Sequence, residues 1–98
     1  MFLNKVLVKY LHAQAMRGSI TNQHMLGKHY YLSEPEYWAK AYAWLSIAAD
    51  QGHEKAKQTV ASLEAKLNQD LLDTGRKLQE DYKREINKKF FFKKTLKK

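Results

Sequence analysis

The chain has 98 residues, enough for one small domain with a single hydrophobic core. Hydrophobic residues make up 44% and charged residues 29%, which is a globular composition, and the lack of cysteine excludes disulfides, thiolate zinc sites and cysteine nucleophiles. Four glycines and one proline are too few turn residues for many short strands, so we expect an all-α fold.

The net charge of +8 is concentrated at the carboxyl end. Residues 83–98 hold eight basic residues against one acid, Glu85, which leaves a net charge of only +1 on residues 1–82. The basic character therefore belongs to the end of the chain and not to its body. Lys5 and Lys9 bracket the apolar run at residues 6–8, so we expect neither a membrane-spanning helix nor an export signal. We therefore expect a cytoplasmic protein.

Local signals predict five helices in chain order. Gly18 and Gly52 each separate two runs of helix-forming residues, as is typical of a left-handed residue after a helix end. Ser33 and Glu36 have the spacing of a capping box, with Pro35 in the first turn, and Asn68 has the place of an N-cap. The expected helices span residues 2–17, 19–32, 34–50, 53–67 and 69–88.

The chain also carries an internal period of 34 residues, the separation of Gly18 and Gly52. At this offset Leu11 aligns with Leu45 and Ala15 with Ala49. Such a period is typical of solenoids built from pairs of helices.

Small and aromatic residues recur in a specific order within this period. The pattern reads Leu26-Gly27-x-x-Tyr30, then Lys40-Ala41-x-x-Trp44-Leu45-x-x-Ala48-Ala49-x-x-Gly52-x-x-x-Ala56. It resembles the Sel-one-like repeat, a relative of the tetratricopeptide repeat. The resemblance implies a short right-handed superhelix of antiparallel helix pairs, about five helices in all. We expect such a domain over residues 1–88, ending in a capping helix, followed by a basic tail at 89–98.

The resemblance also assigns packing roles. Tyr30 and Trp44 occupy packing positions of the repeat and are expected in the core, and Gly27 is expected to let two helices approach closely. Trp38 and Tyr42 are four residues apart, so they are predicted to share a second face that is exposed or covered by a partner.

Residues for catalysis are not arranged in any recognisable pattern. The four histidines, His12, His24, His29 and His53, lack the spacing of a helical zinc site. The motifs of serine hydrolases, nucleotide-binding loops and metalloproteases are absent from the sequence. We therefore expect a protein that is not an enzyme and uses no cofactor and no metal.

The leading hypothesis is an adaptor that binds an unknown protein or peptide on its repeat surface. With Leu26, Gly27 and Tyr30 facing the next helix, the helical period of about 100° per residue turns the opposite side toward solvent. The predicted partner-binding groove comprises Thr21, His24, Met25 and Lys28, and one repeat later Lys55, Gln58, Thr59 and Ser62. The alternative is a plain solvated face.

Two further surfaces are candidates for binding. The tail interleaves lysine with phenylalanine, so it has the chemistry to bind nucleic acid or an anionic membrane, or else it is a frayed, solubilising helix end. Its candidate contacts are Lys88, Lys89, Phe90, Phe91, Phe92, Lys93 and Lys94. Residues 2–17 have no preceding helix to cover apolar side chains such as Leu3 and Leu7, which predicts a weak homodimer.

Overall fold

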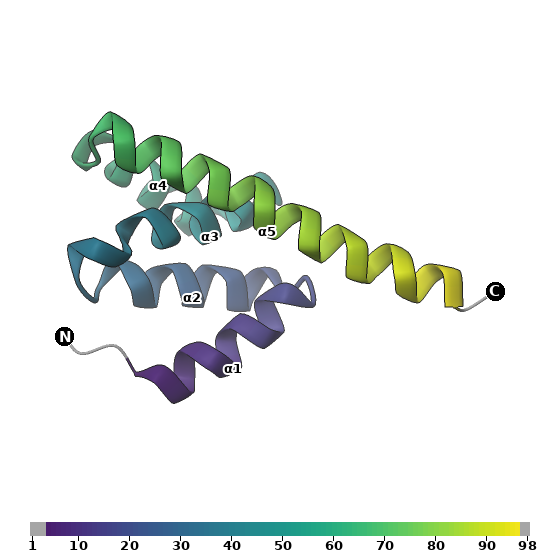
Figure 1. Ribbon diagram of the computed structural model, residues 1–98. Helices are drawn as coiled ribbons and strands as arrows, with labels where there is room; N and C mark the ends of the chain where they lie inside the picture. Colours follow the sequence, from purple (N-terminus) through teal and green to yellow (C-terminus); the bar gives the residue numbers. More distant parts are fainter. Residues whose placement is uncertain (1–3, 97–98) are drawn as a thin grey trace.

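The computed structural model describes residues 4–96, with side chains described for residues 4–88. Within this range the chain forms five α-helices and one 3-10 turn and contains no strand, so the predicted all-α fold is confirmed (Figure 1). The elements are α1 (Lys5–Met16), α2 (Ile20–Tyr31), the turn η1 (Pro35–Tyr37), α3 (Trp38–Asp50), α4 (Glu54–Lys66) and α5 (Gln69–Leu96). Among the described residues, no helix combines the length and the apolarity needed to cross a membrane.

The junctions between helices follow the local sequence. Gly18 and Gly52 adopt φ angles of 94° and 95°, the left-handed conformation predicted for them. Ser19, His53 and Asn68 then each accept, through the side chain, the amide hydrogen of the residue three positions later. The Asn68 cap is the one that the sequence predicts.

The predicted capping box does not form. The hydroxyl of Ser33 donates to the carbonyl of His29 at 2.7 Å, so this side chain terminates α2 and does not begin the next helix. Glu34 occupies the N-cap of η1 without a side-chain cap hydrogen bond. The prediction of a helix from residue 34 is therefore wrong at its start: residues 35–37 form a 3-10 turn and α3 begins at Trp38.

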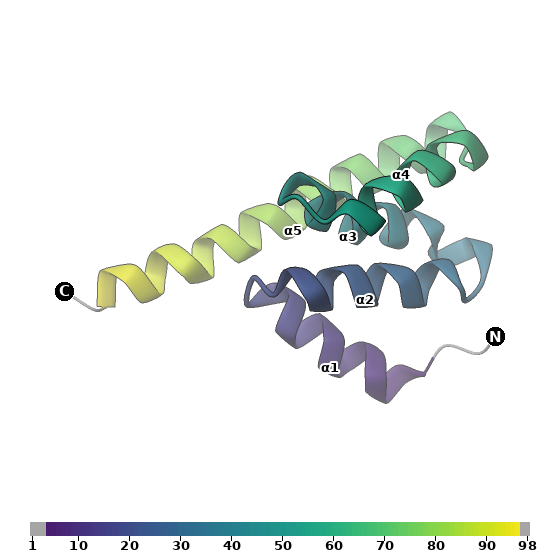
Figure 2. The same ribbon diagram turned by 180° about the vertical axis from the view of Figure 1, so that it is seen from behind.

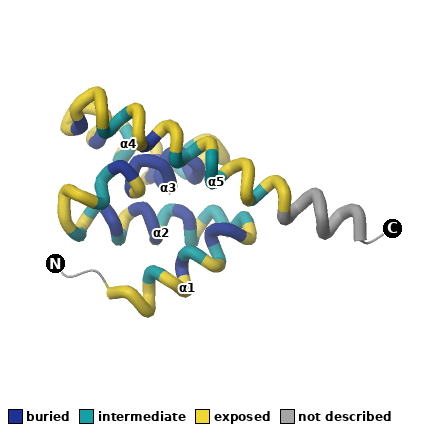
Figure 3. Tube along the Cα trace, viewed as in Figure 1, coloured by how far each residue is buried: buried dark blue, intermediate teal, exposed yellow. Residues whose placement is uncertain are grey.

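α3 is the central helix of the molecule. It packs against α2, α4 and α5, and residues 41–48 are buried without interruption (Figure 3). In the view of Figure 2, α2 and α4 lie in front of α3. In the opposite view of Figure 1, α5 lies in front of α3. The largest fully buried side chains are Trp44, Leu26, Leu45, Leu63 and Gln23. The handedness of the superhelix stays a prediction.

Two glycines allow close helix packing. A Cβ atom on Gly27 would lie 2.6 Å from Cγ of Leu45, which confirms the close approach expected between α2 and α3. A Cβ atom on Gly75 would lie 2.8 Å from Cδ1 of Tyr42. This second approach lets α5 cover Tyr42, so the prediction of an exposed or partner-covered Tyr42 is wrong: its side chain is buried within the chain itself.

α5 is longer than expected. The sequence predicts its end at residue 88, but the helix continues to Leu96 and passes beyond the ends of the other helices (Figures 1 and 2). Lys88 is exposed, 3.9 Å from the carboxylate of Glu85. The other candidate tail contacts, residues 89–94, have side chains outside the described set.

α1 exposes apolar side chains, in keeping with its position at one end of the molecule. Val6 is 81% exposed and Tyr10 is 59% exposed, while Leu3 lies outside the described residues. Self-association through residues 2–17 stays a prediction. Sedimentation velocity over a range of concentrations tests it, and a monomer throughout would contradict it.

Candidate partner-binding face

Two helices that are not adjacent in sequence form one continuous face. At one end, the rings of His24 and His53 stack with centroids 4.1 Å apart and an interplanar angle of 24°. At the other end, the ammonium group of Lys66 donates a hydrogen bond to the hydroxyl of Tyr31. His24 is the fifth residue of α2 and His53 immediately precedes α4, whereas Tyr31 and Lys66 are the last residues of the two helices. The two helices therefore run in the same direction, side by side (Figure 2).

All eight residues of the predicted groove lie on this pair of helices. We call them together the α2–α4 face: Thr21, His24, Met25, Lys28, Lys55, Gln58, Thr59 and Ser62. Six are exposed, whereas His24 and Thr59 are half-buried. Met25 is the one large apolar side chain among them and is 46% exposed. Binding at this face stays a prediction.

His53 stacks on a residue of this face, and the sequence does not single it out. It occupies the N-cap of α4, where its Nδ1 accepts the amide hydrogen of Ala56 at 3.1 Å. In the neutral ring this hydrogen bond places the proton on Nε2, which leaves Nε2–H as a donor. The 34-residue offset aligns His53 with Ser19 and so marks a helix start, but it does not reveal the contact with His24.

The electrostatic environment of His24 is basic. Partial burial lowers the pKa of His24 below its ordinary value of 6.5, and His53, Lys28 and Lys55 lower it further. None of these three neighbours is a carboxylate. Lys28 and Lys55 have no ion-pair partner within the described part of the chain. By contrast, Lys57 on α4 pairs with Glu54 at 3.3 Å. The face therefore carries two lysines that lack an ion-pair partner among the described residues.

This lowered pKa predicts a pH-dependent stability. The unfolded chain holds His24 at its ordinary pKa, so as the pH falls below 6.5 the unfolded state takes up the proton before the folded state does. We expect the free energy of unfolding to decrease over that interval. Denaturant titrations between about pH 5 and pH 8 measure the slope.

The control is the same substitution at another histidine. His24→Gln should reduce the pH dependence of unfolding, and His29→Gln, outside this cluster, should preserve it. An identical slope in the wild type and in His24→Gln would contradict the prediction.

A cavity lies away from this face, between the end of α3 and α5. This cavity has a volume of about 220 Å³ and is open to solvent. It is lined by Gln23, Ile47, Asp50, Gln51, Lys83, Ile86 and Asn87. The sequence carried no signal for it, since its lining comes from three helices and includes no recognisable motif.

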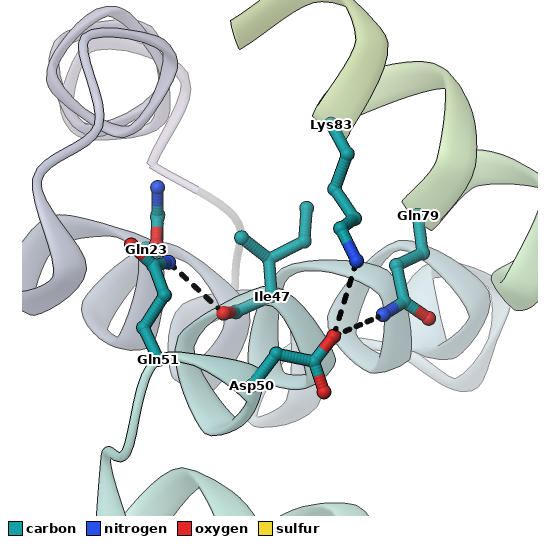
Figure 4. Close-up of polar contacts among 6 residues, drawn as sticks. All are labelled: Gln23, Ile47, Asp50, Gln51, Gln79 and Lys83. Carbon is teal, nitrogen blue, oxygen red and sulfur yellow. Dashed lines mark hydrogen bonds and ion pairs between the residues drawn. The ribbon is translucent and has the colours of Figure 1, made fainter. Parts of the chain in front are cut away.

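Polar side chains at this cavity hydrogen bond to one another (Figure 4). Gln23 is only 1% exposed; its amide donates to the carbonyl of Ala15 at 3.1 Å and accepts from Gln51 at 2.7 Å. The carboxylate of Asp50 accepts from Gln79 at 2.9 Å and lies 3.4 Å from Nζ of Lys83. These contacts connect α1, α2, α3 and α5, so the cluster is explained by its role in holding the helices together.

Comparison with known proteins does not assign this chain to a family. No family model matches the chain, no curated protein matches it, and no solved structure matches it. Within the described residues, no three side chains of the histidine, cysteine, aspartate or glutamate type gather in a way that would hold a metal ion.

Proposed function

We propose that this protein is a non-enzymatic interaction module of the Sel-one-like kind that binds a protein or peptide across the α2–α4 face. The observation that carries the proposal is the parallel arrangement of α2 and α4, which the His24–His53 stack and the Tyr31–Lys66 hydrogen bond connect. Between these contacts lie exposed side chains from both helices. The proposal includes a cytoplasmic location, with which a chain lacking cysteine is compatible.

Site-specific crosslinking tests this proposal. A photoreactive amino acid is placed at Gln58 on the α2–α4 face and, as a matched control, at Glu80, an exposed position on α5. We expect a defined partner to crosslink from Gln58 and not from Glu80. The purified partner should then bind the wild-type chain and lose affinity for Ser62→Trp, which adds bulk to the face. Crosslinking from Glu80 alone would contradict the proposal.

A second candidate function is binding of nucleic acid or an anionic membrane through residues 88–94. The observation that favours it is the continuation of α5 to Leu96, which places these lysines and phenylalanines on one helix. Clustered cations near an anionic surface each gain about 1 kcal/mol, and this gain falls as salt rises.

Truncation separates this candidate from the first. Deleting residues 89–98 removes five lysines and no acid, so the net charge falls from +8 to +3. The truncated chain should keep its cooperative unfolding, because Tyr82 and Ile86 still pack against the core. Full-length protein should bind phosphatidylserine vesicles or an oligonucleotide at low salt, and the truncated chain should not. Equal binding by both would contradict a role for the tail.

A further inference from the structure

We infer that the partner of the α2–α4 face is an acidic peptide segment, with one of its carboxylates held by Lys28 and Lys55 beside the His24–His53 stack. This inference rests on the proposed function, because it names the chemistry of the partner at that same face.

The first support is the gathering of basic groups from two helices. Lys28 lies one turn after His24 on α2, and Lys55 lies two residues after His53 at the start of α4. Both lysines act on His24, so all four side chains share one region of the surface. Like charges repel one another, and neither Lys28 nor Lys55 forms an ion pair with a carboxylate of the described residues. A bound carboxylate would offset that repulsion.

The second support is the set of donors that this region offers. Nδ1 of His53 is occupied by the amide of Ala56, which leaves the Nε2–H of the neutral ring as the donor. Two ammonium groups add further donors, and charge-assisted hydrogen bonds to a carboxylate are about twice as strong as neutral ones. Met25, 46% exposed, follows His24 in the sequence and offers an apolar contact for a peptide side chain.

The extent of the charge favours a peptide over nucleic acid. The face itself carries only two lysines, Lys28 and Lys55, whereas duplex binding is driven by a longer series of phosphate contacts. Glu54 and Glu64 are exposed on α4 and would meet a longer polyanion unfavourably. Residues 1–82 together carry a net charge of only +1. A short acidic segment matches this distribution.

Binding of a carboxylate should be coupled to a proton. The charged groups acting on His24 are Lys28 on its own helix and His53 and Lys55 on α4, and all of them disfavour its protonation in the free protein. A carboxylate beside the ring favours the protonated form, so the complex takes up a proton. Glutamate side chains of the peptide, with an ordinary pKa of about 4.3, stay charged near pH 6. Affinity should therefore rise as the pH falls from about 8 to about 6.

Isothermal titration calorimetry of the full-length chain tests the inference. The probe is a synthetic glutamate-rich peptide, and the reference is the same peptide with glutamine at each glutamate. We expect binding of the acidic peptide only, and a loss of affinity of about three- to tenfold in both Lys28→Gln and Lys55→Gln. The wild type should bind about three- to tenfold more tightly at pH 6 than at pH 8, and His24→Gln should lose that difference.

Two matched controls exclude general charge effects. Lys57→Gln removes a lysine of α4 that is already paired with Glu54 and should change the affinity by less than about twofold. The double variant Lys93→Gln/Lys94→Gln removes the same charge from the tail as Lys28→Gln/Lys55→Gln removes from the face. An equal loss of affinity in the two double variants would overturn the inference.

Other outcomes of these experiments would also overturn the inference. Equal binding of the glutamine peptide, or the same affinity at both pH values, would overturn the inference. Tighter binding of an oligonucleotide that is lost in Lys28→Gln/Lys55→Gln would show that the class of partner is wrong. Crosslinking of a partner from Gln58 whose contact segment is not acidic would refute this inference and leave the proposed function standing.

Discussion

Trp44→Ala is expected to lower the free energy of unfolding by about 3 to 5 kcal/mol, the range for truncating a buried aromatic side chain. Trp44 is fully buried on α3. Its ring stacks on that of Tyr82 from α5, with centroids 4.4 Å apart, and meets the ring of His12 from α1 edge-on at 5.6 Å. The substitution therefore leaves a cavity where three helices meet.

Trp38 provides the matched control for this change. It begins α3, is half-buried, and donates its indole N–H to the carbonyl of Tyr31 at 3.1 Å. Trp38→Ala should cost clearly less than Trp44→Ala when both are measured by chemical denaturation with circular dichroism. If Trp44→Ala is too unstable to purify, Trp44→Phe should show part of the loss. Equal stability of Trp44→Ala and Trp38→Ala would contradict the central position of Trp44.

Gly27→Leu is expected to cost about 1 to 3 kcal/mol through overpacking of α2 against α3. The added Cβ would meet Cγ of Leu45 at 2.6 Å and the backbone nitrogen of that residue at 3.1 Å. A backbone atom of the central helix cannot move aside as the end of a flexible side chain can. Gly27→Ala should cost less, because alanine favours the helix over glycine by about 1 kcal/mol and offsets part of the clash.

Ala13→Leu is the control for size alone, since Ala13 is exposed on α1. Its free energy of unfolding should stay within about 0.5 kcal/mol of the wild type. Thermal unfolding of the three variants gives the comparison. A wild-type melting temperature for Gly27→Leu would exclude a tight contact at this position.

Features that depend on a few neighbouring residues could be predicted from the sequence. Gly18 and Gly52 end helices in the left-handed conformation expected of them, and Asn68 caps α5 as predicted. The capping box failed because Ser33 had two available partners. Its hydroxyl donates to the carbonyl of His29 behind it and does not accept the amide ahead.

Features that depend on distant helices could not be predicted in this way. Tyr42 has the sequence pattern of a partner-covered residue, and the element that covers it is α5, through an approach permitted by Gly75. The exposure of six of the eight residues of the α2–α4 face was predictable, because the helical period alone turns them away from the core. The stack of His24 on His53 was not, because spacing within one helix carries no information about a ring on a parallel neighbour.

The position of α3 also determines how the molecule opens. Because α3 packs against α2, α4 and α5, loss of any of these neighbours exposes its buried residues to water. Amide hydrogens of residues 41–48 should therefore exchange with deuterium only when the whole domain unfolds. α1 packs mainly against α2 and exposes Val6 and Tyr10, so its first turns can unfold locally. Among α1 to α4, the amide hydrogens of these turns should exchange earliest. A protein organised around one central helix is thus a single cooperative unit with a locally unfolding amino-terminal edge.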